Sequence, residues 1–279
     1  MGKIKIAIQG ELGAYSHIAA ENLYKETEIK TCATFEETFK QAYNDSNCKI
    51  VIPIENSLAG RVADIHYLLP KYKLQIHGEH FQPVEHNLLC KQDANMEDIK
   101  FVRSHAQAIG QCQNLINKKK FKQIISADTA GSAKDLAEGN DKSIAAIASE
   151  LSAKIYNLKI LQKNIEDEKG NVTRFLIMGK NAEHPEFKNE KYITSCIFKV
   201  KDKPAALYKC LGGFATNNIS LSKLESFSDQ SSFEQYLFLC DIVGHIEDPK
   251  VQKSLEELGF HTVSLDILGV YKASSFRKN

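Results

Sequence analysis

The chain has 279 residues, of which 43% are hydrophobic and 25% are charged, and its formal net charge is +1 at pH 7. This length exceeds one typical hydrophobic core, so we expect two domains or a domain divided by a cleft. The balanced charge argues against a nucleic-acid binder, because such proteins usually carry a basic excess.

The beginning of the chain and the cysteine pattern predict a cytoplasmic protein. Met1 is followed by alternating residues typical of a strand and not by the basic head and apolar stretch of a signal peptide. No apolar run reaches about 18 residues, so we expect no membrane span. The seven cysteines are scattered without a Cys-x-x-Cys pair, which argues against a disulfide framework and against a zinc site.

Residues 1–180 predict two α/β lobes, because strand-like and helix-like patterns alternate in an order that favours mostly parallel sheets covered by helices. We expect lobe 1 to comprise about 1–80 plus 160–180, and lobe 2 about 81–159. The predicted strands are Lys3–Ile8, Lys49–Ile54, Gln75–His80, Glu85–Cys90, Phe101–Arg103, Gln123–Ala127, Ser143–Ile147 and Asn171–Met178, the last returning to the first lobe. The predicted helices are Ser16–Tyr24, Thr34–Tyr43 with a capping box, Val62–Leu69, Gln107–Lys118, Ala130–Glu138 and Ser149–Tyr156.

The pattern changes after the polar segment 181–191, which predicts a linker. Residues 192–275 then predict a second domain in βαββαβ order, the ferredoxin-like split unit. Its predicted elements are the strand Tyr192–Val200, the helix Ala205–Ala215, the strands Ile219–Phe227 and Phe233–Val243, the helix Pro249–Leu258 and the strand Thr262–Tyr271.

Small polar residues gather where predicted strands end. They form the five segments Gly10–His17, Pro53–Ser57, Ser104–Gln107, Asp128–Gly131 and Asn171–Phe175. Ligands of open α/β sheets bind at the carboxyl edge of the strands. Four segments precede a helix, where free backbone N–H groups attract anions, and the fifth carries an arginine, which can grip a carboxylate. The segments predict a pocket for a small anion.

Each segment also has a purely structural interpretation. Gly10-x-x-Gly13 can be a tight turn, Ser104 and Gln107 a capping box, and Asp128 or Thr129 a helix N-cap. Glu55 and His105 can be buried polar groups with ordinary hydrogen-bond partners. No single segment decides the function.

Taken in order, the segments resemble the motif series of prephenate dehydratases. The motifs Glu55-Asn-Ser57 and Thr173-Arg-Phe175 are specific to that family and to its relative, arogenate dehydratase, and the resemblance extends from about Lys3 to Tyr271. The segment from Lys203 to Ser226 is similar to the family's ACT regulatory domain. The resemblance implies an α/β fold with a two-lobed, periplasmic-binding-protein-like catalytic domain over residues 1–180, followed by a ferredoxin-like βαββαβ ACT domain over residues 192–275.

The resemblance further implies the decarboxylating dehydration of prephenate to phenylpyruvate in phenylalanine biosynthesis, with no cofactor and no metal. Thr173 would bond the departing ring oxygen, His105 would supply a proton and Glu55 would orient a donor. Arg174 would anchor a substrate carboxylate. The remaining implied substrate-binding residues are Asn56, Ser57, Ser104, Gln107, Thr129, Tyr15, Ser16 and Phe175.

For the C-terminal domain, the resemblance implies feedback inhibition by phenylalanine and a homodimer or homotetramer formed through both domains. The implied phenylalanine-binding residues are Ala205, Ala206, Leu207, Leu224, Glu225 and Ser226. Two positions depart from the family pattern: Ala205 replaces a glycine, and Phe227-Ser228 replaces Arg-Pro, which removes a charged contact. A purely architectural dimerisation domain is the alternative.

Two other functions stay open. An arogenate dehydratase would act on a substrate with an amino group in place of the keto oxygen. A two-lobed small-molecule-binding protein would have no activity, and an assay for phenylpyruvate distinguishes it from an enzyme.

Overall fold

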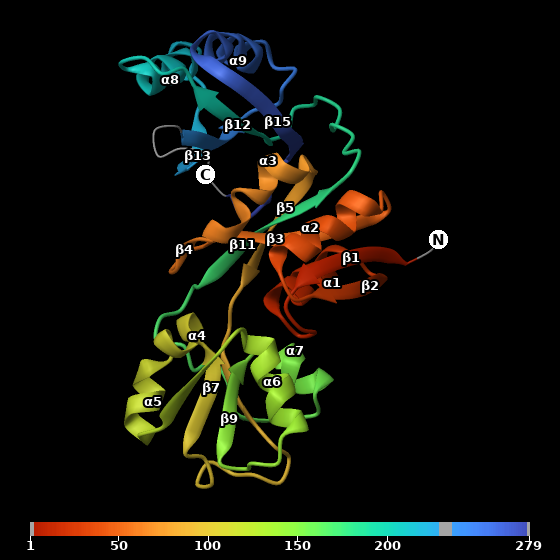
Figure 1. Ribbon diagram of the computed structural model, residues 1–279, viewed down its shortest axis with the longest axis vertical. Coiled ribbons are helices and arrows are strands. Elements are labelled where there is room, and N and C mark those ends of the chain that lie inside the picture. Colours follow the sequence, from red (N-terminus) through yellow and green to blue (C-terminus); the bar gives the residue numbers. More distant parts are fainter. Residues whose placement is uncertain (1–2, 229–235, 278–279) are drawn as a thin grey trace. The chain divides into compact units, whose positions relative to one another are not determined.

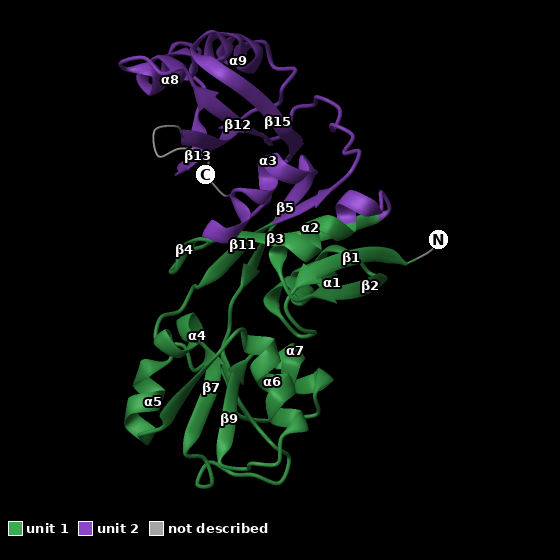
Figure 2. Cartoon of the chain, in the orientation of Figure 1, with its two compact units in different colours: residues 1–41, 48–62, 80–175 green, residues 42–47, 63–79, 176–279 purple. Residues whose placement is uncertain are grey.

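The computed structural model describes residues 3–228 and 236–277 (Figure 1). Contacts divide the chain into two compact units, which Figure 2 colours separately. Unit 1 comprises Met1–Gln41, Cys48–Val62 and His80–Phe175, and unit 2 comprises Ala42–Asn47, Ala63–Glu79 and Leu176–Asn279. Short pieces from the N-terminal half of the chain therefore pack with the C-terminal part.

The first sheet has the strand order β2-β1-β3-β11-β5, and β4 pairs with β3 outside this order. Strand β1 runs parallel to both β2 and β3. The predicted return of the chain to this sheet is confirmed, because β11 lies between β3 and β5. The strands are β1 (Ile4–Gln9), β2 (Thr27–Cys32), β3 (Cys48–Asn56), β4 (Gly60–Arg61), β5 (Gln75–Pro83) and β11 (Val172–Gly179); the helices are α1 (Tyr15–Leu23), α2 (Phe35–Asn44), the 3₁₀ helix η1 (Ala63–Ile65) and α3 (Leu68–Tyr72).

The second sheet lies within unit 1 and has the order β10-β6-β9-β7-β8. Strand β7 pairs in parallel with β8 and β9, whereas β6 is antiparallel to β9 and β10. Its elements are β6 (Asn87–Cys90), β7 (Phe101–His105), α4 (Ala106–Gly110), α5 (Gln113–Lys119), β8 (Lys122–Ser126), α6 (Thr129–Glu138), β9 (Ile144–Ala148), α7 (Glu150–Ile155) and β10 (Lys159–Gln162).

The third sheet lies in unit 2, has the order β13-β14-β12-β15 and is antiparallel throughout. Its elements are β12 (Tyr192–Val200), α8 (Ala206–Thr216), β13 (Leu221–Ser228), β14 (Tyr236–Val243), α9 (Pro249–His261) and β15 (Thr262–Lys272). This is the ferredoxin-like arrangement. The predicted fold class is therefore confirmed: two α/β lobes are followed by a ferredoxin-like βαββαβ unit.

Several predicted elements differ from the structure. The predicted helix Gln107–Lys118 is two helices, α4 and α5, and the predicted helix Val62–Leu69 is replaced by η1 and α3. Strands β2 and β10 were not predicted. Three of the six residues of β2 are exposed and only one is buried, so it lacks the apolar alternation by which strands are recognised. The first residues of the predicted strand Phe233–Val243 lie outside the described residues.

The hydrophobic cores include all seven cysteines. Cys90 and Cys112 belong to the core of the second sheet, Cys196, Cys210 and Cys240 to the core of the third, and each thiol is buried and unbridged. Over residues 3–228 and 236–277, the longest apolar helical stretch falls short of what a membrane crossing requires.

Candidate active site

The end of β3 and the start of β11 bring Asn56 and Thr173 together. The backbone N–H of Ser57 donates to the Val172 carbonyl, and the Val172 N–H donates to the Ser57 hydroxyl, both at 2.9 Å. With the backbones joined in this way, the Asn56 amide nitrogen donates to Thr173 Oγ1 at 2.9 Å. The hydroxyl of Ser57, one of the predicted substrate-binding residues, thus joins the end of β3 to the start of β11.

The orientation of the Asn56 amide is fixed by the backbone. Its Oδ1 accepts hydrogen bonds from the N–H groups of Leu58 at 3.0 Å and Ala59 at 2.8 Å. Because a backbone N–H can only donate, the other end of the side chain must be the NH₂ group. Thr173 Oγ1 is therefore an acceptor toward Asn56, and the threonine hydroxyl hydrogen remains available to another acceptor.

Three side chains that the sequence analysis did not assign to the site extend this arrangement. Asn171 Oδ1 accepts from Asn56 at 2.6 Å, and Asn171 Nδ2 donates to Gln111 Oε1 at 2.9 Å. The same Gln111 oxygen lies 2.9 Å from His86 Nε2. Asn171 and His86 are 3% and 2% exposed, so these are buried polar contacts of a kind that must be hydrogen-bonded.

Tyr15, the first residue of α1, lies next to His86 at the end of this hydrogen-bond network. Its hydroxyl donates to the Glu85 carbonyl at 2.6 Å and lies 3.2 Å from His86 Nδ1. Burial, and to a lesser degree the nearby charges of Glu166, Cys112 and Glu85, raises the pKa of Tyr15 well above its ordinary value. The phenol therefore keeps its proton at neutral pH.

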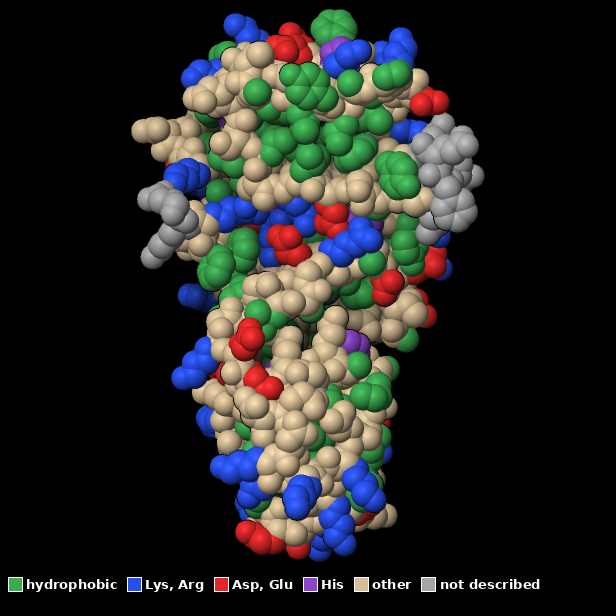
Figure 3. All heavy atoms as spheres, turned by 90° about the vertical axis from the view of Figure 1, so that its left-hand side faces the viewer, with side chains coloured by type: hydrophobic (Ala, Val, Ile, Leu, Met, Phe, Trp, Pro, Cys, Tyr) green, Lys and Arg blue, Asp and Glu red, His purple; other side chains and the backbone are tan. Residues whose placement is uncertain are grey.

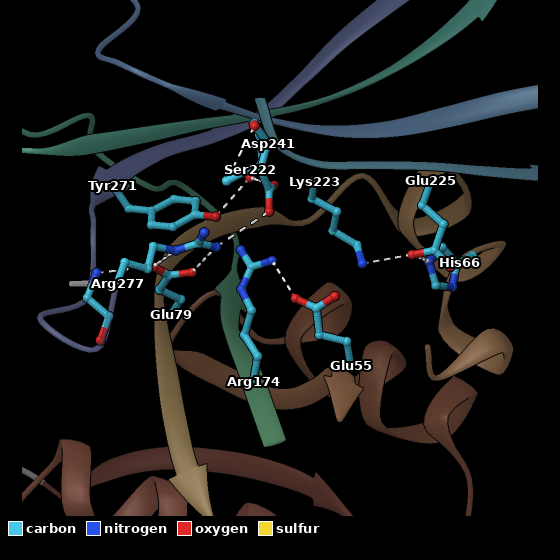
Figure 4. A network of polar contacts seen from close by, with 12 residues as sticks. Glu55, His66, Glu79, Arg174, Ser222, Lys223, Glu225, Asp241, Tyr271 and Arg277 are labelled. Atoms are coloured by element: carbon cyan, nitrogen blue, oxygen red, sulfur yellow. Dashed lines mark hydrogen bonds and ion pairs between the residues drawn. The ribbon is translucent and has the colours of Figure 1, made fainter. Parts of the chain in front are cut away.

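Glu55 and Arg174 lie apart from these donors. Successive strand residues point to opposite faces, so Glu55 and Arg174 face away from Asn56 and Thr173. Arg174 is 2% exposed, and its Nη1 lies 3.4 Å from Glu55 Oε1 (Figure 4). The structure pairs these two predicted site residues with each other, and their roles in anchoring the substrate and orienting a donor stay predictions.

The predicted site residues of the second lobe are differently placed. Ser104 is fully buried, and its hydroxyl donates to the Ile147 carbonyl of the neighbouring strand at 2.6 Å, so in the structure its hydroxyl joins two strands. His105 caps α4, and its Nδ1 accepts from the Gln107 N–H at 3.3 Å. Gln107 is exposed, and Thr129 is the first residue of α6, whose N-cap is Asp128.

Two further predicted residues point into the protein. Phe175 is 2% exposed and belongs to the core. Ser16 is 7% exposed, and its hydroxyl donates to the Gln9 carbonyl at 3.4 Å. A direct ligand contact does not fit either side chain as it lies in the structure.

One sequence signal could have indicated Gln111. It follows Gln107 by four residues and therefore lies on the same side of a helical turn. The break between α4 and α5 falls directly at Gln111 and Cys112. Asn171 stands at the head of the polar segment Asn171–Phe175, which was its signal. For His86 we find no comparable signal, because its contacts are made between segments far apart in the sequence.

The predicted phenylalanine-binding residues occupy α8 and β13 in unit 2. Ala205 has a left-handed backbone (φ 59°) and precedes α8, while Ala206 is buried and Leu207 packs against the core. On β13, Leu224 and Ser226 are exposed and alternate with Glu225. The Glu225 carboxylate lies 2.8 Å from Lys223 Nζ and 3.2 Å from His66 Nε2, so it pairs inside the protein (Figure 4).

Comparison with known proteins identifies the family. A family model described as prephenate dehydratase matches residues 6–183. A Komagataeibacter europaeus protein named bifunctional N-acyl-homoserine lactone acylase/prephenate dehydratase is 38% identical over 277 residues, with 99% of each chain covered. The prephenate dehydratase of Methanocaldococcus jannaschii is 37% identical, with 93% of this chain and 94% of the relative covered.

Further relatives carry a second activity in their names. Arogenate dehydratase/prephenate dehydratase 2 of Arabidopsis thaliana is 37% identical, with 96% of this chain and 73% of the relative covered.

Two solved structures resemble the whole chain. One is described as a novel type of quorum quenching acylase, with a TM-score of 0.92, 38% identity and coverage of 98% of this chain and 100% of that chain. The other is a prephenate dehydratase from Arthrobacter aurescens in complex with L-Phe, with a TM-score of 0.89, 24% identity and coverage of 99% and 92%. The second likeness speaks for the fold alone. Together with the match over residues 6–183, these similarities establish that the chain belongs to the prephenate dehydratase family.

Proposed function

We propose that this protein converts prephenate to phenylpyruvate. The observation that carries the proposal is the bond from Asn56 to Thr173 Oγ1, which leaves the Thr173 hydroxyl hydrogen for a ligand. A donor fixed in advance at the position of a leaving oxygen stabilises the charge that develops there.

The reaction needs such a donor. As the ring carboxylate leaves as CO₂, the electrons of the breaking C–C bond form a ring double bond, and the ring C–O bond breaks. The departing hydroxide takes up one proton and leaves as water. The prephenate dianion and a proton thus give the phenylpyruvate anion, CO₂ and water. In this proposal Thr173 hydrogen-bonds the departing oxygen, and its hydroxyl positions or relays the proton.

Other side chains supply the remaining contacts in this proposal. Gln111 Oε1 is bonded to Asn171, so the Gln111 NH₂ group, which has no partner among residues 3–228 and 236–277, offers a second donor. His105 remains the proposed proton source in its protonated form, in which Nδ1 gives up the bond it accepts from the Gln107 N–H and Nε2, which makes no hydrogen bond in the described part of the chain, can donate. The Glu55–Arg174 pair orders the same strand ends from their other face.

The deciding experiment incubates the purified chain with prephenate and, in parallel, with arogenate. Phenylpyruvate is followed by its absorbance, and phenylalanine by chromatography. We expect phenylpyruvate from prephenate. Phenylalanine formed from arogenate at a higher kcat/KM would assign the protein to the second substrate. The absence of both products would reject the proposal and favour a binding protein.

A third assay addresses the acylase activity named for the Komagataeibacter relative, which is similar to this chain over its full length. The substrate is an N-acyl-homoserine lactone, and release of the fatty acid is measured. Fatty-acid release that persists when Thr173 is replaced by valine would assign it to a different set of residues.

We further propose that phenylalanine binds beside α8 and β13 and inhibits the enzyme. The Arthrobacter structure binds L-Phe and has the same fold. Ala205, Ala206, Leu207, Leu224, Glu225 and Ser226 remain the proposed contacts, and the Glu225 carboxylate also pairs with Lys223 and His66. Calorimetry with L-Phe, with D-Phe as the control, tests the proposal, and equal heats for both would reject it.

Self-association is part of the same proposal. Figure 3 shows hydrophobic side chains gathered on the surface of unit 2, and its exposed residues include Tyr208 (80%) and Leu224 (39%). Patches of this kind usually mark contact surfaces. Sedimentation analysis should give a homodimer or homotetramer. A cytoplasmic location completes the proposal and agrees with the unbridged thiols.

A further inference from the structure

A hydrogen-bond chain connects Thr173 to His86 through Asn56, Asn171 and Gln111, and the donor and the acceptor of each bond can be assigned in turn. It starts at the backbone N–H groups of Leu58 and Ala59, which fix Asn56 with its NH₂ group toward Asn171. Asn171 must then accept through Oδ1 and donate through Nδ2, so the Gln111 atom that receives this bond is the carbonyl oxygen. Each amide orientation follows from the one before it.

The direction of the chain determines the tautomer of His86. Gln111 Oε1 has no hydrogen, so at 2.9 Å His86 Nε2 must donate. A neutral ring then has no hydrogen on Nδ1; the Tyr15 hydroxyl lies 3.2 Å from this nitrogen, but its one hydrogen is donated to the Glu85 carbonyl at 2.6 Å. Burial lowers the pKa of His86, although the bond to Gln111 and the charge of Glu166 act in the opposite direction, and a neutral ring is consistent with these contacts.

The protein holds His86 and Gln111 against one short segment. The backbone N–H of His86 donates to Glu166 Oε2 at 3.0 Å, and the backbone carbonyl of His86 accepts from the Ile165 N–H at 2.9 Å. The backbone carbonyl of Gln111 accepts from the Asp167 N–H at 2.7 Å. Segment 165–167 therefore ties the backbones of His86 and Gln111 to each other.

We propose that His86, as the Nε2–H tautomer, is a positioning residue of the active site. Its Nε2–H holds the side-chain oxygen of Gln111, Oε1, and so leaves the Gln111 NH₂ group facing the substrate. The assignment rests on the proposed dehydratase function. His86 makes no contact with the reacting atoms. It acts through Gln111. Gln111 in turn bonds Asn171, which bonds the Asn56 amide that orients Thr173.

Two substitutions at His86 test this role. Glutamine can place an amide N–H near the former Nε2, whereas asparagine places its amide near the former Nδ1. We expect His86→Gln to keep most of the wild-type kcat, and His86→Asn to lose about 10²-fold, the scale on which misplacing a reacting group slows a reaction. The melting temperature is measured for both. A kcat of His86→Asn equal to or above that of His86→Gln would overturn the proposal.

A measurement on the unmodified protein does not depend on the folding of any variant. The protein is labelled with ¹⁵N-histidine, and the His86 signals are assigned by their loss in His86→Gln or, if that variant does not fold, by their correlation to the backbone. We expect Nε2 to carry the proton at neutral pH and Nδ1 to be unprotonated. A proton on Nδ1 would overturn the proposal.

The outcomes separate the two levels of inference. If wild-type protein forms phenylpyruvate and the two His86 variants are equally active, the proposed function stands and the role of His86 fails. If wild-type protein forms no product, the proposed function fails, and the role of His86 in that reaction fails with it, while the tautomer measurement still tests the direction of the hydrogen-bond chain.

Discussion

The amide nitrogen of Asn56 lies 2.9 Å from the hydroxyl oxygen of Thr173, and the amide is the donor of the bond between them. The two residues are separated by 117 positions in the sequence, and pairing of β3 with β11 brings them together. A threonine hydroxyl that accepts from a fixed donor has its own hydrogen directed to a second partner.

Replacing Thr173 by valine removes the hydroxyl at nearly unchanged volume. Asn56 Nδ2 keeps its contacts to Asn171 Oδ1 and the Val172 carbonyl, so the fold should be retained. We expect kcat with prephenate to fall by about 10²–10³, the usual loss on removal of one preorganised donor, while KM changes much less. Thr173→Ser is the control and should stay close to wild type. A change confined to KM would contradict the leaving-group role.

Alanine substitutions at Gly13 and Gly10 allow the cost of crowding to be separated from the cost of backbone strain. Both have positive φ, +90° and +96°. A Cβ at Gly13 would lie 2.7 Å from Ser152 Cα, whereas a Cβ at Gly10 would have Ala14 Cβ at 3.9 Å as its nearest neighbour. Gly10→Ala should lower the free energy of unfolding by about 1–2 kcal/mol from backbone strain, and Gly13→Ala by about 1–3 kcal/mol more from overpacking. Urea unfolding followed by circular dichroism measures both, and equal losses would contradict the account.

The backbone of Ala205 is strained. Its φ of 59° and ψ of 24° are left-handed, and its side chain is exposed. Ala205→Gly should raise the free energy of unfolding by about 0.5–1 kcal/mol, because the strain relieved exceeds the entropy that glycine adds to the unfolded chain. Ala215→Gly, at an exposed helical position in α8, is the control and should lower stability. A loss of stability in both variants would exclude strain at Ala205.

Glu225 predicts a pH dependence of stability. Burial alone would raise the pKa of Glu225, but the hydrogen bond from Lys223 and the charges of His66 and Lys223 outweigh it, so the pKa is lowered below 4.5. A lowered folded-state pKa contributes stability that is present above about pH 4.5 and is lost as the pH falls through the folded value. Glu225→Gln should cost about 1–3 kcal/mol at pH 7.

The pH series supplies the control for this prediction. Below the folded-state pKa of Glu225 the wild-type carboxyl is also neutral, so the stabilities of wild type and Glu225→Gln should converge in acid. Melting temperatures from pH 3 to pH 8 measure the difference. A difference that stays constant over this range would show that the charge of Glu225 is not its cause.

The sequence predicted β12 best. Its bounds, Tyr192–Val200, agree with the prediction, and seven of its nine residues are buried, so the strand forms one uninterrupted run. The same reasoning missed β2, since an edge strand with the sequence TEIKTC buries little and has no apolar period. It also missed the break at Gln111 and Cys112 between α4 and α5, where the Gln111 backbone carbonyl accepts from the Asp167 N–H, a contact distant in the sequence.

For the site, the sequence indicated which strand ends matter but not which side chains face one another. Asn56 and Thr173 were both named, and the structure joins them. Alternation could also have separated Arg174 from Thr173, because neighbours on a strand point to opposite faces. The contacts of His86 with Gln111 and Tyr15 depend on tertiary packing, which no local pattern encodes.

The buried thiols make each sheet observable on its own. Cys32 and Cys48 lie on strands of the first sheet, Cys90 and Cys112 in the core of the second, and Cys196, Cys210 and Cys240 in the core of the third. A buried thiol reacts with an alkylating reagent only when its surroundings open. Mass spectrometry of alkylated peptides would therefore time the opening of each sheet separately in the unmutated protein, and would register which of them a bound ligand rigidifies.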